Sequence, residues 1–147
     1  MITRAHITRR AATDGVPAKT VERDYVLAHI IAGLASLKRE TGLVFKGGTA
    51  LRLCHFDDYR YSADLDFSIV AGSREDAYAT IEEALAVTGG TTNGLRLTDH
   101  GPPKVAYIGP LRRERTLKLD MAIDELVINV EVQALLPRWE DLPPDVS

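Results

Sequence analysis

The sequence predicts an α+β protein in which helices flank a mixed β-sheet. Two long segments, residues 17–39 and 74–88, carry apolar residues at helical spacing, and several short segments alternate apolar and polar residues as strands do. Helices mixed with neighbouring β-hairpins are typical of this fold class. With 147 residues, 45% of them hydrophobic and 27% charged, the chain has the size and composition of one globular domain.

The first half of the chain is predicted to begin with a polar N-terminal arm over residues 1–16. The helix over 17–39 that follows has a wide apolar stripe, which predicts that it is mostly buried. The next elements are short and are predicted, in order, as a strand over 43–45, a helix over 49–55 and a strand over 65–70.

The second half begins with the predicted helix over 74–88, which Ser73 caps with Asp76 at the capping-box offset. Further strands are predicted at 94–98, 105–108, 116–124 and 126–133. Residues 137–147 contain three prolines and read as a Pro-rich tail or a truncated linker. The predicted core domain therefore covers residues 17–136.

Composition excludes several classes of protein. The net charge of −3 argues against a globally basic nucleic-acid binder, although residues 111–115 form a local arginine-rich segment. Cys54 is the only cysteine, so neither an intramolecular disulfide nor a cysteine-ligated zinc is expected. No apolar run reaches the roughly 18 residues of a membrane span, and no apolar signal region follows Met1. We expect a cytoplasmic protein with no membrane partner.

Asp64 and Asp66 are the most informative pair of residues. Side chains alternate along a strand, so these two carboxylates share one face and repel each other. A divalent cation between them would relieve that repulsion. The alternative is an ordinary strand face that water solvates.

Asp120 repeats this pattern on a later strand, with Lys118 on the same face. If that strand lies beside the strand of Asp66, three carboxylates can hold two magnesium ions roughly 3.5–4 Å apart, as in phosphoryl or nucleotidyl transfer. The alternative for Asp120 is a plain surface residue. Lys118 could bind a triphosphate or simply pair with Asp120.

The turn at Gly47, Gly48 and Thr49 joins a predicted strand to a predicted helix. Two glycines allow a positive φ and the close approach of a ligand, and the N–H groups of a helix start can bind an anion. Thr49 could cap the helix or bind a phosphate oxygen. The alternative is a structural turn without a ligand.

Several other polar residues carry weaker signals. Arg52 could reach a phosphate or lie on a solvated helix surface, and His29 is expected to be solvated on the polar stripe of its helix. Ser62 is interpreted as a turn cap. The arginines at 112, 113 and 115 could contact an RNA backbone or belong to a solvated hairpin loop.

Taken together, these motifs resemble the nucleotidyltransferase fold of the polymerase-β type and, more narrowly, the AbiEii/AbiGii toxin family, which includes the MenT-like toxins. The resemblance rests on four blocks that occur in the family's order, at residues 23–27, 44–51, 60–67 and 117–120.

This resemblance implies a Mg²⁺-dependent nucleotidyltransferase that is the toxin of a toxin–antitoxin or abortive-infection system. Such an enzyme transfers NMP from an NTP to an RNA acceptor, the 3′ end of tRNA, and releases pyrophosphate; a cognate antitoxin is the expected partner. The catalytic and metal-binding residues it implies are Asp64, Asp66 and Asp120, and the nucleotide-binding residues are Gly47, Gly48, Thr49 and Lys118.

One departure from the family pattern keeps a second hypothesis open. Family members usually continue into a helical region with a Glu-Lys pair and an Arg-Asp-x-x-Asp-like segment, and nothing in this sequence matches either. The alternative is therefore a catalytically weak or inactive nucleotide-binding interaction module.

Overall fold

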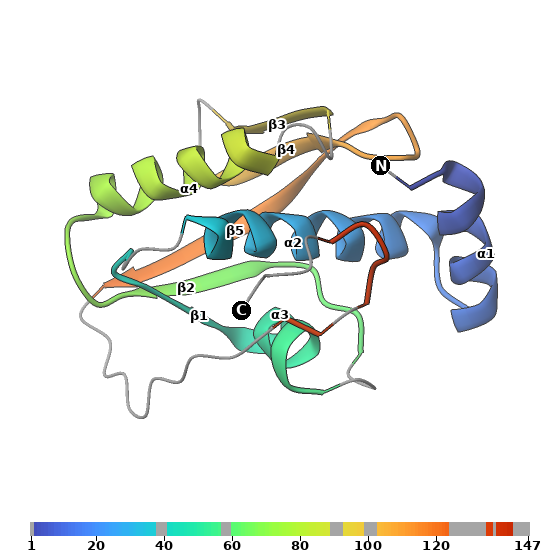
Figure 1. The fold of residues 1–147 in the computed structure, drawn as a ribbon, viewed down its shortest axis with the longest axis horizontal. Helices are drawn as coiled ribbons and strands as arrows, with labels where there is room; N and C mark the ends of the chain where they lie inside the picture. The colour runs from blue at the N-terminus through green and yellow to red at the C-terminus, as the bar shows by residue number, and fades with distance from the viewer. Residues whose placement is uncertain are drawn as a thin grey trace.

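The computed structural model describes residues 2–37, 41–56, 60–88, 93–98, 103–123, 135–136 and 138–142. It confirms the α+β class, with a mixed sheet flanked by helices (Figure 1). The elements are α1 (Arg4–Asp14), α2 (Ala18–Ser36), β1 (Leu43–Lys46), α3 (Gly47–Ala50), the π-helix η1 (Leu51–His55), β2 (Leu65–Ile69), α4 (Arg74–Thr88), β3 (Asn93–Leu97), β4 (Lys104–Ile108) and β5 (Glu114–Ile123).

The described strands form a five-stranded sheet in the order β1-β2-β5-β4-β3. Only β2 and β5 pair in parallel, and the other neighbouring strands are antiparallel. β5 therefore joins the first half of the chain to the hairpin of β3 and β4. The strand predicted over 126–133 lies outside the described residues.

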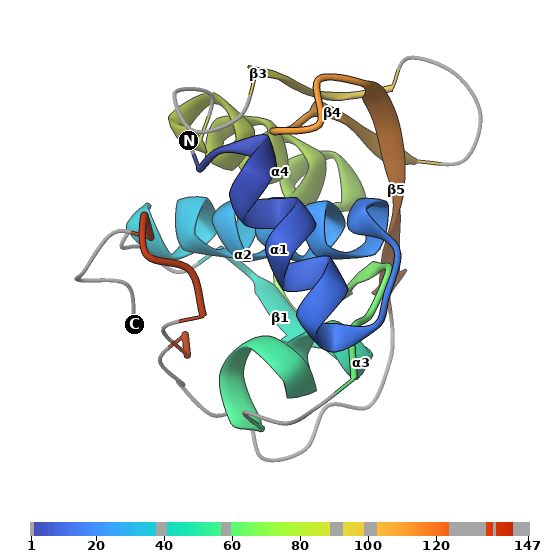
Figure 2. The same cartoon turned by 90° about the vertical axis from the view of Figure 1, so that its right-hand side faces the viewer.

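The helices α1, α2 and α4 lie to one side of β5 (Figure 2). Leu65 and Phe67 of β2 and Leu117 and Leu119 of β5 point into the core that these helices cover. Because side chains alternate along a strand, the residues between them point to the opposite face of the sheet. That opposite face carries the charged residues discussed below.

Helix α4 begins where its capping box predicts. The Ser73 hydroxyl accepts a hydrogen bond from the Asp76 backbone N–H at 3.0 Å, and the Asp76 carboxylate accepts one from the Ser73 N–H at 2.9 Å. These reciprocal bonds satisfy two N–H groups that a helix start otherwise leaves unpaired.

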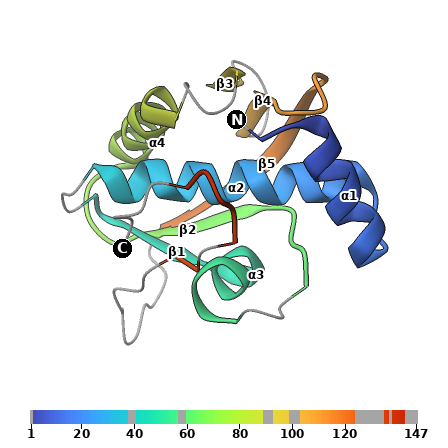
Figure 3. The same ribbon diagram turned by 45° about the vertical axis from the view of Figure 1, so that its right-hand side comes forward.

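Both ends of the described chain pack on α2. The predicted N-terminal arm forms α1, which buries Ile7 and Ala11, and Trp139 is buried against Tyr25 with ring centroids 5.1 Å apart. In Figure 3, α1 crosses one end of α2 and residues 138–142 run beside α2. The division into arm, core and tail stays a prediction, although parts of all three share one core.

The prediction that His29 is solvated was wrong. His29 is only 2% exposed, and its Nε2 lies 3.0 Å from the Asp141 carboxylate, which also accepts a hydrogen bond from the Tyr25 hydroxyl. Burial lowers the pKa of His29, although the negative charge of Asp141 opposes this shift. Residues 138–142 cover the polar stripe, which a helix considered alone leaves in water.

We expect the protein to lose stability as the pH falls below about 6.5, the ordinary pKa of histidine. The native state binds the His29 proton more weakly than the unfolded chain does, because burial lowers the pKa of His29 in the folded state. The stability contributed by neutral His29 is thus present above that pH and lost below it. Urea unfolding at pH 7.5 and 5.5 tests this, and His29→Gln should show the smaller loss. An equal loss in both proteins would exclude His29 as its source.

Candidate active site

The predicted carboxylates come together at the parallel pair of strands. Asp66 of β2 lies opposite Asp120 of β5, and Lys46 of β1 lies opposite Asp66 on its other side. Three neighbouring strands thus place Lys46, Asp66 and Asp120 in one row across the sheet. Asp64 comes directly before β2, two residues from Asp66.

Negative charge accumulates around Asp66. Burial raises the pKa of Asp66, and the charge of Asp120, a hydrogen bond with Asp120 and the charge of Asp64 raise it further, whereas Lys46 lowers it. Two hydrogen-bonded carboxylates with a third nearby hold a proton more tightly than an isolated carboxylate does. A cation bound here would remove that repulsion.

Lys118 pairs with Asp120, with its Nζ 3.4 Å from Oδ2. Both side chains are largely exposed, at 58% and 49%. Exposed ion pairs contribute only about 0–1 kcal/mol, so such a lysine readily exchanges its carboxylate for another anion. Of the two roles expected for Lys118, the structure shows the ion pair with Asp120. Triphosphate binding by Lys118 stays a prediction.

The donor set fits a hard divalent cation. Within the residues that the structure describes, no three carboxylate, imidazole or thiol groups stand close enough together to enclose a metal ion. Asp66 and Asp120 are adjacent and carry the oxygen donors that Mg²⁺ prefers, and burial, followed by the charges of Asp120 and Asp64, raises the pKa of Asp66. Asp66 and Asp120 can therefore supply two oxygen ligands to Mg²⁺, and the role of Asp64 as a third ligand stays a prediction.

The glycine turn lies directly against Asp66. Gly47 has a φ of 81°, and a Cβ atom added there would lie 2.5 Å from the Asp66 Oδ2. Gly48 lies inside α3 and does not have a positive φ. Of the two glycines in the turn, only Gly47 must therefore be a glycine. Its lack of a side chain lets the backbone lie directly against the Asp66 carboxylate.

Gly47→Ala is expected to lower the free energy of unfolding by more than about 1 kcal/mol, since left-handed backbone and overlap with Asp66 both oppose a Cβ. Gly48→Ala is the matched control and should be tolerated, because alanine favours a helix over glycine. Urea unfolding of both variants makes the comparison. Equal destabilisation by the two changes would contradict the assignment of the strained position.

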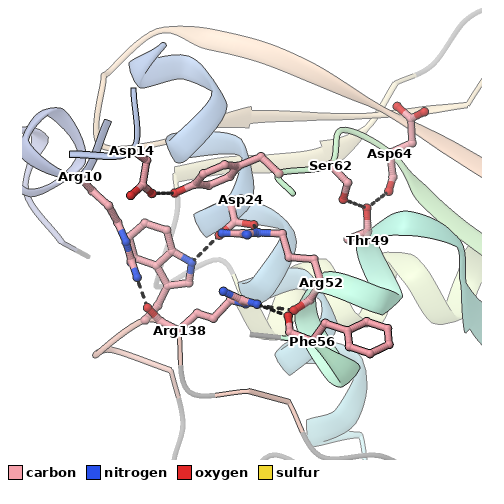
Figure 4. Close-up of polar contacts among 11 residues, drawn as sticks. Arg10, Asp14, Asp24, Thr49, Arg52, Phe56, Ser62, Asp64 and Arg138 are labelled. Atoms are coloured by element: carbon pink, nitrogen blue, oxygen red, sulfur yellow. Dashed lines mark hydrogen bonds and ion pairs between the residues drawn. The ribbon is translucent and has the colours of Figure 1, made fainter. Parts of the chain in front are cut away.

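Thr49 uses its hydroxyl inside the protein. The side chain is buried, and the hydroxyl hydrogen-bonds to the Ser62 hydroxyl and to the Asp64 backbone carbonyl (Figure 4). The Asp64 carboxylate points away from Thr49 in the same view. Thr49 thus ties the glycine turn to the segment that carries Asp64, and its role toward phosphate stays a prediction.

Arg52 occupies neither environment expected for it. It lies buried in η1, where its guanidinium donates from Nε to Asp24 and places Nη2 3.3 Å from the Asp24 Oδ2. The guanidinium also lies 3.9 Å from the centre of the Tyr61 ring. Both alternatives, phosphate contact and solvation, were wrong because α2 supplies a buried carboxylate partner.

Asp24, Arg52 and Trp139 form a buried cluster that sequence reasoning missed. The Trp139 Nε1 donates to Asp24 at 3.1 Å, and Arg138 donates to the backbone carbonyls of Arg52 and Phe56. Figure 4 shows Asp24, Arg52 and Arg138 around η1. Two features of the sequence could have indicated this cluster: Asp24 lies in the first family block, residues 23–27, and Trp139 is the only tryptophan of the chain. The cluster holds the helical segment that continues the glycine turn.

The arginine-rich loop between β4 and β5 is held from beneath by Glu22. This carboxylate is fully buried, accepts a hydrogen bond from the Leu111 N–H at 2.6 Å and lies 3.7 Å from the Arg115 Nε. Burial raises the pKa of Glu22. Arg112 and Arg113 are exposed. Contact with an RNA backbone and plain solvation therefore both stay open for these two residues.

In the part of the chain that the structure describes, no helix combines the length and apolar character needed to cross a membrane.

Comparisons with known proteins show the family of this chain and a similar fold. A family model described as nucleotidyl transferase AbiEii toxin, type IV TA system, matches residues 30–146. The fold is similar to that of MenT4, a nucleotidyltransferase toxin from Mycobacterium tuberculosis H37Rv, with a TM-score of 0.62 and 25% identity. The match covers 83% of this chain and 44% of MenT4, so the chain spans less than half of that protein. None of the curated proteins matches the chain. Because the family model covers most of its length, the chain belongs to the AbiEii nucleotidyltransferase toxin family.

Proposed function

We propose that this chain is a Mg²⁺-dependent nucleotidyltransferase and the toxin of a toxin–antitoxin system. It transfers NMP from an NTP to an RNA acceptor, the 3′ end of tRNA, in the cytoplasm, and a cognate antitoxin restrains it. The observation that carries the proposal is the pairing of Asp66 with Asp120 beside the Gly47 turn. Family membership supports nucleotidyl transfer, and the family description supports a toxin–antitoxin system.

In this proposal each site residue has a separate task. Asp66 and Asp120, with Asp64, hold the divalent metal. When bound, the metal neutralises phosphate charge and aligns the attacking and leaving oxygens. Gly47 and Gly48 let the triphosphate approach the backbone, and Lys118 exchanges Asp120 for phosphate. Thr49 holds the segment of Asp64 in place through its bonds to Ser62 and the Asp64 carbonyl.

A second candidate is a nucleotide-binding interaction module with little or no catalytic activity. The observation that favours it is that, among the described residues, no three carboxylate, imidazole or thiol groups stand close enough together to enclose a metal ion. Nucleotide would then bind at the same turn without transfer.

The test is incubation with each of the four NTPs, labelled at the α-phosphate, with total RNA and Mg²⁺, followed by gel analysis. The proposal expects one or more labelled RNA bands that disappear with EDTA and in Asp66→Asn. Nucleotide binding without labelled RNA would favour the interaction module. Label on protein instead of RNA would retain the enzyme and reject the RNA acceptor.

A further inference from the structure

Two pairs of like charges face each other across neighbouring strands on the polar face of the sheet. Asp66 lies opposite Asp120 in the β2–β5 pair, and Lys104 lies opposite Lys118 in the β4–β5 pair. The residues next to the lysines, Val105 and Leu117, belong to the core. Lys104 and Lys118 therefore point to the face opposite the helices, and both are exposed.

Like charges directly opposite each other destabilise a sheet. Lys118 relieves part of this repulsion through its 3.4 Å contact with Asp120. Among the described residues, no carboxylate forms an ion pair with Lys104. The two pairs are thus unfavourable by themselves and are opposite in sign, which is the charge pattern that a metal–polyphosphate complex would satisfy.

Their separation also suits such a ligand. Lys118 precedes Asp120 by two residues on the same strand, or about 7 Å, and Lys104 lies one strand further, or about 5 Å. A metal held at Asp66 and Asp120 would therefore lie within the reach of one extended anion that also contacts both lysines. Lysine side chains are long and flexible enough to converge on its oxygens.

We propose that Lys104 and Lys118 together bind the β- and γ-phosphates of the nucleoside triphosphate. The inference rests on the proposed function and deepens it, because it makes Lys104 a substrate-binding residue. The α-phosphate then lies toward the Asp66–Asp120 pair, where the reaction takes place. The part of the substrate that leaves as pyrophosphate lies on the lysines.

The test compares wild type, Lys104→Gln and Lys104→Arg by isothermal titration in Mg²⁺. The ligands are the NTP that wild type binds most tightly, its monophosphate and inorganic tripolyphosphate. Lys104→Gln should weaken triphosphate and tripolyphosphate binding by roughly 10- to 100-fold, the usual loss of a charge-assisted hydrogen bond, and leave monophosphate binding unchanged. Lys104→Arg should restore most of the affinity. Lys19→Gln removes an exposed lysine at the start of α2 and is the matched control.

Thermal unfolding adds a readout that binding alone does not give. The ligand-free Lys104→Gln protein should melt at the same or a higher temperature than wild type, because it loses a like-charge pair. A lower melting temperature would mean that Lys104 supports the fold, which would overturn the inference.

Wild-type affinity for triphosphate in Lys104→Gln, or an equal loss with the monophosphate, would also overturn it. A different result would reject the proposed function and keep the inference about Lys104. In that case wild type would bind triphosphate in a Lys104-dependent manner and transfer nothing to RNA. Absence of both triphosphate and tripolyphosphate binding in wild type would reject the two proposals together.

Discussion

Replacing Asp66 or Asp120 with asparagine is expected to abolish nucleotide transfer and leave the protein folded. Each change removes an oxygen charge from the only pair of carboxylates that the structure places opposite each other in the described strands. The expected loss of rate is roughly 10²–10³-fold or more, as when a group that stabilises transition-state charge is removed. The double variant should be no worse than either single variant, because the two residues act as one unit.

Whereas turnover falls, the free energy of unfolding of Asp66→Asn should rise. The raised pKa of Asp66, caused first by burial and then by Asp120 and Asp64, shows that the surroundings disfavour its charged form. Asparagine removes that charge and keeps nearly the same shape. Turnover is measured with the labelled-NTP assay and stability by urea unfolding. Glu82→Gln, on the exposed face of α4, is the matched change from carboxylate to amide. Near wild-type turnover in either aspartate variant would reject the site.

The largest loss of stability is expected from Arg52→Ala. This change leaves Asp24, which is 1% exposed, without the guanidinium that neutralises it. Breaking a buried ion pair from one side typically costs about 3–5 kcal/mol, since an uncompensated charge remains inside the protein. Arg52→Lys should recover little, because an ammonium cannot reproduce the planar fork that reaches both Asp24 oxygens and lies over Tyr61.

Urea unfolding gives these free energies directly. Arg9→Ala is the control, because Arg9 is exposed on α1 and should change stability by less than about 0.5 kcal/mol. Replacing both partners, as in Asp24→Leu with Arg52→Met, should cost less than Arg52→Ala alone. A change within about 1 kcal/mol of wild type for Arg52→Ala would show that the pair contributes little. Activity should fall with stability, since η1 continues the segment of the glycine turn.

Much of the fold could be predicted because its signals are local. The helix predicted over 74–88 is α4 with the same bounds, since Ser73 and Asp76 exchange hydrogen bonds only three residues apart. The alternation in β2 likewise places Asp66 on the face opposite Leu65 and Phe67 without reference to any tertiary contact. Caps and alternation involve near neighbours in the chain, so a short window of sequence contains them.

Local sequence patterns therefore specify the set of elements, the polar face of each strand and the family motifs. The tertiary structure alone decided which distant groups meet. It paired Asp66 with Asp120 through the parallel register, joined Asp24 to Trp139 across 115 positions of the chain, and covered His29 with residues 138–142. The sequence around a polar residue does not show whether water or a buried partner forms its hydrogen bonds. Tertiary packing determines which partner lies within reach.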